Sequence, residues 1–458
     1  MSIQLEVGTM VSNKKILAIT IPLILQQLTH YLQTTVQQAM LGRIDPIYFS
    51  AMGNLRVLTF VFIMIGALDT GTIIWIAQSI GAKDTLQAQR YAESAFIGNA
   101  ILSLIVFMCL FFGNQYVFRL MGLQSPVLEY SASYLKISSL GFLGLGLAPT
   151  FICIVQGLGN TKIIMYWALI CNFLTILLSY IFILGNFGFP QMNLDGAAYA
   201  SLISNVIGSS ILLVYVFSNK KMPFKLNIKK ISNFRWNLYK KIVTIGLPAG
   251  FENFVWEIGQ LMIISFLNRE DIKSTGIFTL IYTIQMVPAC FNVGLSKTAL
   301  TLVGQKTGED DHKGAVVAGF RCLCFSMVIC ILMVLLFLFY PQRIIGLFTA
   351  DESFIQDTIP CLILAGFILF PKAINNVIGF GIIGMGDTKW MLYMQILGCI
   401  FVVTLSYISI FIFNYSVFMI FIIILIEETL RSIVHLLRFL KGREFFFLKP
   451  FQKITKVQ

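Results

Sequence analysis

The segment Lys14-Lys-Ile-Leu-Ala-Ile-Thr-Ile-Pro22 returns at an offset of 226 residues as Lys240-Lys-Ile-Val-Thr-Ile-Gly-Leu-Pro248. Two further motifs recur at an offset of 227 residues: Gly157-Leu-Gly-Asn-Thr-Lys162 with Gly384-Met-Gly-Asp-Thr-Lys389, and Gln78-Ser-Ile-Gly81 with Gln305-Lys-Thr-Gly308. Each short motif is a weak signal by itself, but the shared offset indicates an internal duplication. We therefore predict a chain made of two similar halves.

The composition indicates a membrane protein. Of the 458 residues, 57% are hydrophobic and only 12% are charged, which is more apolar surface than a water-soluble core can bury. Apolar runs of about 20 residues recur, enough to cross about 30 Å of hydrocarbon as helices, and the alternating pattern of membrane β-strands is missing. We predict an all-α polytopic membrane protein with twelve transmembrane helices in two pseudo-symmetric six-helix lobes. The spans are expected near residues 16–41, 52–80, 91–117, 128–157, 163–185, 194–217, 242–268, 274–303, 314–340, 355–383, 390–413 and 416–438.

The distribution of charge predicts the orientation and the domain boundaries. Although the net charge is +12, the basic residues lie between the apolar spans, so the pattern does not indicate nucleic-acid binding. Most basic residues fall in loops that are cytoplasmic if both termini are cytoplasmic, which is the orientation that the positive-inside rule predicts. Since six spans separate equivalent motifs, the halves are parallel repeats. The predicted domains are an amino-terminal lobe at 1–217, a basic cytoplasmic linker at 218–241, a carboxy-terminal lobe at 242–440 and a basic cytoplasmic tail at 441–458.

The repeated motifs, together with Gly42 and Asp195-Gly-Ala-Ala-Tyr199, resemble those of the multidrug and toxic compound extrusion (MATE) family. This family belongs to the multidrug/oligosaccharidyl-lipid/polysaccharide flippase superfamily, and the resemblance covers nearly the whole chain. It implies a secondary active antiporter of the cytoplasmic (inner) membrane that exports organic, cationic or amphipathic compounds in exchange for Na⁺ or H⁺. The expected partners are a small-molecule substrate, the coupling ion and the bilayer. We expect a monomer with no other cofactor, and the sequence has no GxxxxGK[ST] loop for ATP.

Several positions depart from the family pattern. Many bacterial members carry an aspartate about five residues before the glycine that corresponds to Gly42, where this chain has Gln37. In the fifth span, Thr175 and Ser179 stand where an asparagine and an aspartate are common. The segment Glu252-Asn-Phe-Val-Trp256-Glu257 instead resembles the acidic seventh-span pattern of eukaryotic and some bacterial members. The resemblance therefore implies an ion site in the carboxy-terminal lobe.

A stripe of polar side chains runs along the first span. Gln26, His30, Gln33 and Gln37 recur at helical spacing, and unpaired amides would be costly in lipid. We predict that this stripe lines a water-accessible cavity. Interhelical hydrogen bonds within the lobe are the alternative, and His30 fits either a neutral, hydrogen-bonded histidine or a proton carrier.

Acidic residues inside the spans are the candidates for ion coupling, because each needs a partner or a watery cavity. We predict that Glu252, Glu257 and Asp69 couple the ion, and that Glu252 exchanges a proton near neutral pH. A hydrogen bond or a buried base could instead neutralise Glu252 or Glu257. The repeat maps Asp69 next to Lys297, so we expect an opposite-charge pair across the cleft, with separate local partners as the alternative. The predicted substrate cavity comprises Gln26, His30, Gln33, Gln37, Asn253, Trp256, Gln260 and Lys297.

Two other groups of charges have simpler interpretations. Glu427, Glu428 and Arg431 are three and four residues apart, which predicts an ion pair within the last helix. Lys372 is interpreted as a snorkelling or gating residue near the end of its span.

Two other functions compete with export. A flippase for a lipid-linked saccharide or another lipid would need a cleft rich in Arg and Lys for pyrophosphate, and the spans hold few such residues. An integral membrane enzyme would need a nucleophile, a metal or a phosphate-binding cluster, and the three histidines include no HExxH pair. We therefore predict a transporter and not an enzyme.

Overall fold

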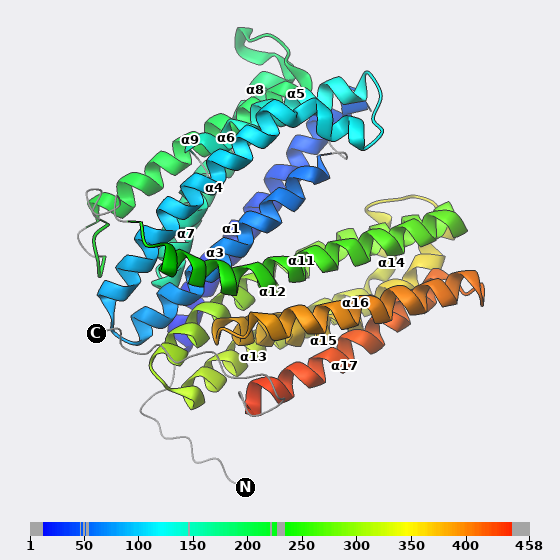
Figure 1. Cartoon of the computed structure of the whole chain (residues 1–458). Helices are drawn as coiled ribbons and strands as arrows, with labels where there is room; N and C mark the ends of the chain where they lie inside the picture. Colours follow the sequence, from blue (N-terminus) through cyan, green and yellow to red (C-terminus); the bar gives the residue numbers. More distant parts are fainter. Residues whose placement is uncertain are drawn as a thin grey trace. The chain divides into compact units, whose positions relative to one another are not determined.

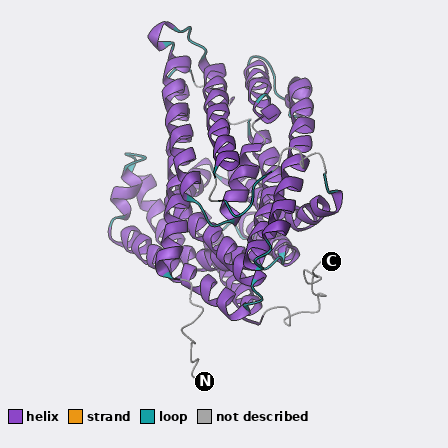
Figure 2. Ribbon diagram, turned by 90° about the vertical axis from the view of Figure 1, so that its left-hand side faces the viewer, coloured by secondary structure: helices purple, strands orange, loops and turns teal. Residues whose placement is uncertain are grey.

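The computed structural model of the chain describes residues 12–45, 47–48, 51, 55–144, 147–219, 222–226 and 234–441. Over these residues, Figure 2 shows helices and loops and no strand, so the all-α prediction is confirmed. The tail at 442–458 and much of the predicted linker at 218–241 lie outside the described residues. The division of the chain into lobes at this linker therefore stays a prediction.

Figure 1 shows the order of the helices along the chain. The first half contains α1 (Asn13–Gly42), α3 (Arg56–Gly81), α4 (Thr85–Leu120), α5 (Val127–Ser139), α6 (Gly141–Gly144), α7 (Leu147–Gly157), α8 (Lys162–Leu184), a 3₁₀ turn (Asn186–Gly188) and α9 (Asn193–Ser218). The second half contains α11 (Trp236–Glu270), α12 (Ile272–Gly308), α13 (His312–Phe339), α14 (Pro341–Gly346), α15 (Glu352–Gly384), α16 (Thr388–Phe411) and α17 (Val417–Lys441).

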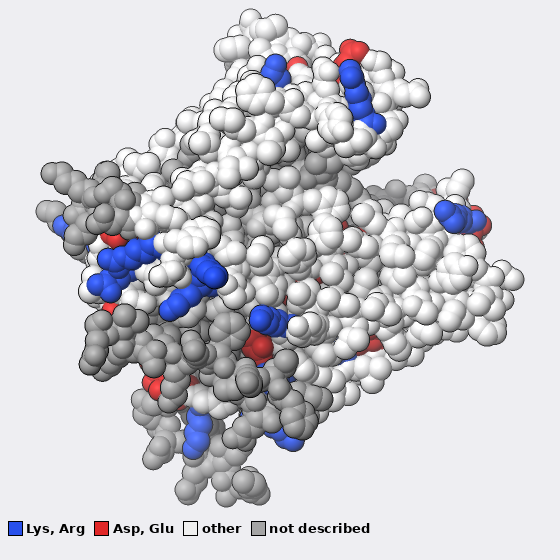
Figure 3. Space-filling model, viewed as in Figure 1, with Lys and Arg blue, Asp and Glu red and all other residues white. Residues whose placement is uncertain are grey.

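Each predicted span corresponds to a helix or a broken helix. Eight helices of the described chain are long and apolar enough to cross a membrane: α3, α4, α8, α9, α12, α13, α15 and α16. The helices α1, α11 and α17 are also long, with 30, 35 and 25 residues, but contain more polar side chains. On the face shown in Figure 3, charged residues gather near helix ends, and the broad surfaces between them are uncharged. This distribution fits a multi-pass membrane protein.

The predicted span at 128–157 is not one continuous helix. The helical stretches Val127–Leu143 and Ala148–Gly157 meet at an angle of 53°, on either side of residues 145–146, which lie outside the described part. The sequence Gly141-Phe-Leu-Gly-Leu-Gly-Leu-Ala-Pro149 explains the break, because glycine and proline are the poorest helix formers. The predicted span therefore corresponds to a bent pair of helical stretches.

The internal repeat is visible in backbone conformation. Lys83 after α3 and Asp310 after α12 both have positive φ angles, of 58° and 60°. In each case the next residue, Asp84 or Asp311, accepts a hydrogen bond of 2.8 Å from a backbone N–H in the first turn of the following helix. These positions are equivalent at the offset of 227 residues, so both halves use the same turn and the same N-cap.

The chain forms two compact units, Ile21–Gly250 (the amino-terminal unit) and Met1–Thr20 with Phe251–Gln458 (the carboxy-terminal unit). The helices α1 and α11 therefore each begin in one unit and continue in the other. Each unit has its own buried core, around Phe118 and Leu135 in the first and around Ile281 and Ile420 in the second.

The beginnings of α1 and α11 pack at repeat-equivalent positions. In the amino-terminal unit, α11 crosses α3 so closely that a Cβ atom on Gly246 would lie 2.2 Å from the Ala67 carbonyl oxygen, and one on Gly71 would lie 2.3 Å from the Ile242 oxygen. In the carboxy-terminal unit, α1 meets α12 where the hydroxyls of Thr20 and Thr298 lie 2.9 Å apart. Gly246 corresponds to Thr20 in the repeat. The crossing of α3 and α11 is therefore made by close contact at glycines, and the crossing of α1 and α12 by a pair of hydroxyl groups.

Candidate functional site

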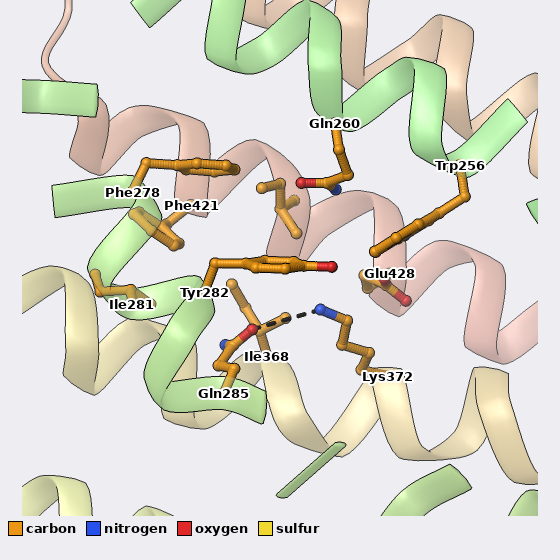
Figure 4. Close-up of a pocket in the computed structure, with 11 residues that line it drawn as sticks. Trp256, Gln260, Phe278, Ile281, Tyr282, Gln285, Ile368, Lys372, Phe421 and Glu428 are labelled. Carbon is orange, nitrogen blue, oxygen red and sulfur yellow. Dashed lines mark hydrogen bonds between the residues drawn. The ribbon is translucent and has the colours of Figure 1, made fainter. Parts of the chain in front are cut away.

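A pocket lies inside the carboxy-terminal unit, between α11, α12, α15 and α17 (Figure 4). The lining combines aromatic and aliphatic side chains with four polar ones. The polar ones are Gln260 from α11, Gln285 from α12, Lys372 from α15 and Glu428 from α17.

Two aromatic rings form one wall of the pocket. The ring centroids of Trp256 and Tyr282 lie 6.1 Å apart with an angle of 34° between the planes. Trp256 and Gln260 are four residues apart on α11, and therefore project from the same face of that helix. Both were predicted to line the substrate cavity, and here they line one pocket.

Lys372 points into the pocket. Its Nζ atom donates a hydrogen bond of 3.4 Å to the Gln285 Oε1 atom (Figure 4). Of the two interpretations of Lys372, snorkelling does not fit, because the ammonium group turns toward α12 and the pocket interior, and a gating role stays a prediction. Gln285 also donates to the Ala365 carbonyl oxygen at 3.0 Å, which holds the amide in place.

A buried ion-pair cluster adjoins the pocket on α17. Arg431 lies 3.0 Å from the Glu427 Oε1 atom through its Nε and 3.0 Å from the Glu428 Oε2 atom through its Nη2. The Asn375 Nδ2 atom donates to the Glu428 Oε2 atom at 2.6 Å, and Arg431 also donates to Gln395. The predicted intrahelical ion pair is confirmed, and its carboxylates are buried.

Glu252 lies one helical turn before Trp256 on α11 and is half-buried. The guanidinium of Arg431 interacts with it electrostatically, but no hydrogen bond joins the Glu252 carboxylate to another described residue. Glu257 is also half-buried, and Asn253 is exposed. Neither of these two belongs to the pocket lining.

The amides of the first-span stripe are placed differently from one another. Gln33 and Gln37 are buried in the amino-terminal unit, and the Gln33 Nε2 atom donates to the Gln37 Oε1 atom at 3.2 Å. The Gln37 Nε2 atom donates to the Ala197 carbonyl oxygen and to the Ser179 hydroxyl, both at 3.1 Å. These contacts fit the alternative interpretation, in which the stripe makes hydrogen bonds between helices of one lobe. A water-accessible stripe stays a prediction.

The other two positions of the stripe are less enclosed. Gln26 is half-buried, and its Oε1 atom accepts no hydrogen bond within the described chain, whereas the His30 side chain is exposed. Asp69 and Lys297 belong to different units, so their pairing also stays a prediction.

Known proteins match this chain over most of its length. The MatE family matches twice, at residues 22–181 and 248–408, which start at the repeat offset of 226. The chain belongs to the MATE family. It is 27% identical to a probable multidrug resistance protein NorM of Thermotoga maritima over 386 residues, covering 82% of this chain and 81% of that protein. It is 25% identical to an uncharacterised transporter, YisQ, of Bacillus subtilis over 385 residues, covering 83% of both chains.

Solved structures show the same fold. A MOP superfamily transporter from Pyrococcus furiosus superposes with a TM-score of 0.85 at 22% identity, over 93% of this chain and 95% of that one. A multidrug resistance MATE family transporter in an outward-facing conformation gives a TM-score of 0.86 at 21% identity, with the same coverage. MATE proteins are transporters, so this chain is a multidrug-type transporter of the membrane and not an enzyme.

Two amides that support this pocket of the MATE chain, Gln285 and Asn375, were not predicted from the sequence. Gln285 is flanked by Ile284 and Met286 in α12, and Asn375 is followed by Asn376 in α15. An amide in a membrane span is itself a signal, because it must find a partner. The α17 cluster lies beyond both matched segments, which end at residue 408.

Proposed function

We propose that this MATE protein exports amphipathic organic compounds across the cytoplasmic membrane as a monomer, in exchange for H⁺ or Na⁺. Glu252 is the coupling carboxylate, and the adjacent pocket in the carboxy-terminal unit holds the compound. Both termini are cytoplasmic in this proposal. The multidrug resistance names of the relatives support the direction and the kind of cargo.

The observation that carries the proposal is the position of Glu252. It is half-buried beside Arg431 and one turn from Trp256, without a hydrogen bond to the described residues that would hold its charge in one state. The neighbouring Glu427 and Glu428 are instead both ion-paired with Arg431. Glu252 is therefore the carboxylate of this group that can gain or lose a proton or Na⁺ at the smallest structural cost.

Transport by reconstituted protein tests the proposal. Proteoliposomes would be loaded or diluted to impose a pH gradient or a Na⁺ gradient separately, with uptake of a fluorescent organic compound as the readout. Wild type should transport under one of the two gradients. Glu252→Gln keeps the size and the hydrogen-bonding capacity but removes the exchangeable charge, so gradient-driven transport should collapse while the elution profile stays that of folded protein.

Asp69→Asn is the matched comparison, because it removes a span carboxylate in the amino-terminal unit. Normal transport by Glu252→Gln together with loss of transport in Asp69→Asn would move the coupling site to that unit and refute the assignment of Glu252.

A further inference from the structure

Lys372 brings a positive charge into a pocket that is otherwise lined by aromatic and aliphatic side chains, two amides and the ion-paired carboxylate of Glu428. Within the described chain, no carboxylate oxygen lies within 4.0 Å of its Nζ atom, and its hydrogen-bond partner is the neutral oxygen of Gln285. An ammonium group has three donors, so further hydrogen bonds from Nζ can be made toward the pocket.

The nearby carboxylates are occupied by other partners. The Glu428 Oε2 atom receives the Arg431 guanidinium at 3.0 Å and the Asn375 amide at 2.6 Å, and Glu427 also pairs with Arg431. Glu428 forms part of the pocket wall, but its charge is shared with Arg431 and not directly with Lys372. A ligand in the pocket therefore meets Lys372 as the charged group that lacks a direct ion partner.

The rest of the lining fits a flat, ring-containing molecule. The rings of Trp256 and Tyr282 face the pocket from adjacent helices, with Tyr282 lying between Gln260 and Lys372 in the view of Figure 4. The amides of Gln260 and Gln285 offer donors and acceptors beside the ammonium group. An aromatic body can thus lie against the rings while a polar group reaches the nitrogen atom of Lys372.

We propose that this pocket binds aromatic compounds that carry an anionic group, such as a carboxylate or a sulfonate, which pairs with the Lys372 ammonium. The inference rests on the proposed export function and narrows its cargo. It differs from the cationic cargo that the family resemblance implies, because a cation in this pocket would lie beside an ammonium group of like charge. A zwitterion can still enter with its acidic group toward Lys372.

The test uses three probes that share one ring system and differ in permanent charge: naphthalene-2-sulfonate, (naphthalen-2-ylmethyl)trimethylammonium and naphthalene-2-methanol. Calorimetric titration of the purified, detergent-solubilised full chain measures their affinities. Wild type should bind the sulfonate most tightly. Lys372→Met should weaken sulfonate binding about tenfold or more, which is the usual effect of losing one charge-assisted contact. The affinity for the neutral alcohol should stay unchanged.

Variants at the same position separate charge from shape. Lys372→Arg should keep the preference for the sulfonate, and Lys372→Glu should reverse it toward the trimethylammonium probe. Lys313→Met is the matched control, because it removes an exposed lysine at the start of α13 and should alter no affinity. Binding of the neutral probe reports whether each variant still has a folded pocket.

Three results would overturn the inference: wild type prefers the cation, wild type binds none of the probes, or Lys372→Met binds the sulfonate as tightly as wild type. The wild-type comparison needs no variant and decides even if every substitution unfolds the protein. Gradient-driven transport of an organic cation, with no binding of the sulfonate, would refute this inference and leave the export function standing. The absence of any organic transport under either gradient would instead refute the export function.

Discussion

Arg431 compensates two carboxylates of its own helix, and both carboxylates are buried while the arginine is half-buried. A charge of this kind is costly to take out of water, so it is retained only with close partners. The group formed by Glu427, Glu428 and Arg431 has a formal charge of −1, and Lys372 beyond it carries +1. The side chains around the pocket thus balance as a set, and Glu252 is the additional carboxylate whose state changes that balance.

Replacing Arg431 should show how much its ion pairs contribute to the stability of the protein. Arg431→Met leaves two buried carboxylates without a base, and removal of one partner from a buried ion pair typically costs about 3–5 kcal/mol. We expect a large fall in the melting temperature of the detergent-solubilised protein. Adding Glu427→Gln and Glu428→Gln to the same chain should recover much of that loss. If the triple variant is as unstable as Arg431→Met, the guanidinium contributes by packing and not by charge.

Gln37 shows how one residue changes what a lobe can do. The resemblance to MATE proteins places an aspartate here in many members, and an amide cannot exchange a proton near neutral pH. In the structure this amide instead donates hydrogen bonds to the Ser179 hydroxyl and to the Ala197 carbonyl oxygen. These hydrogen bonds join α1 to other helices of the amino-terminal unit at the position where other members carry an acid.

At the scale of helices, the crossing of α3 and α11 depends on small residues. Ala67 and Gly71 on α3 and Gly246 and Gly250 on α11 are spaced by four, so each pair projects from one helix face. The backbones approach so closely that carbonyl oxygens occupy the space where side chains would begin. Close van der Waals contact stabilises helix pairs in a bilayer, where no hydrophobic effect drives them together.

A single methyl group at this crossing should therefore be harmful. In Gly71→Ala the new Cβ would lie 2.3 Å from the Ile242 carbonyl oxygen, and a backbone atom cannot rotate away. We expect a loss of about 1–3 kcal/mol, as for other overpacked cores, seen as a lower melting temperature in detergent. Gly66→Ala on the same helix is the control, because its Cβ meets nothing within 4 Å and should not destabilise. Equal melting temperatures for both variants would show that the helices separate without cost.

At the scale of the whole molecule, the duplication explains why the two units exchange the first residues of the equivalent helices α1 and α11. The first residues of α1 belong with the carboxy-terminal unit, and those of α11 belong with the amino-terminal unit. Both exchanges end within two residues of a proline, Pro22 and Pro248, which stand inside continuous helices. Parallel repeats of this kind require an even number of spans per half, so we predict that both termini lie on one side of the membrane.

The orientation can be tested with fused reporters. Reporters of cytoplasmic location placed after Lys230 and after Lys449 should both be active, and one placed near Gln191 should report the exterior, because basic loops are retained on the cytoplasmic side. Immunodetection of equal expression levels provides the control. An exterior signal at Lys230 would contradict the predicted topology.

The sequence by itself determined the fold class, the positions of the helices and the duplication. These features depend on local hydrophobic length and on motifs that are compared along the chain, so no spatial information is needed. The same reasoning paired Glu427, Glu428 and Arg431, because residues three and four apart on one helix must be neighbours. Hydrophobic length alone did not give the size of the bend at residues 140–149, where glycine and proline interrupt an apolar run.

The tertiary structure alone decided which side chains from different helices meet. Lys372 and Gln285 are 87 residues apart, and Gln37 and Ser179 are 142 apart. Their contacts depend on the rotation and the axial shift of each helix against its neighbours, which side-chain packing sets and a periodic pattern does not. For this reason the sequence pattern did not show that the Lys372 ammonium group points into the pocket of the carboxy-terminal unit.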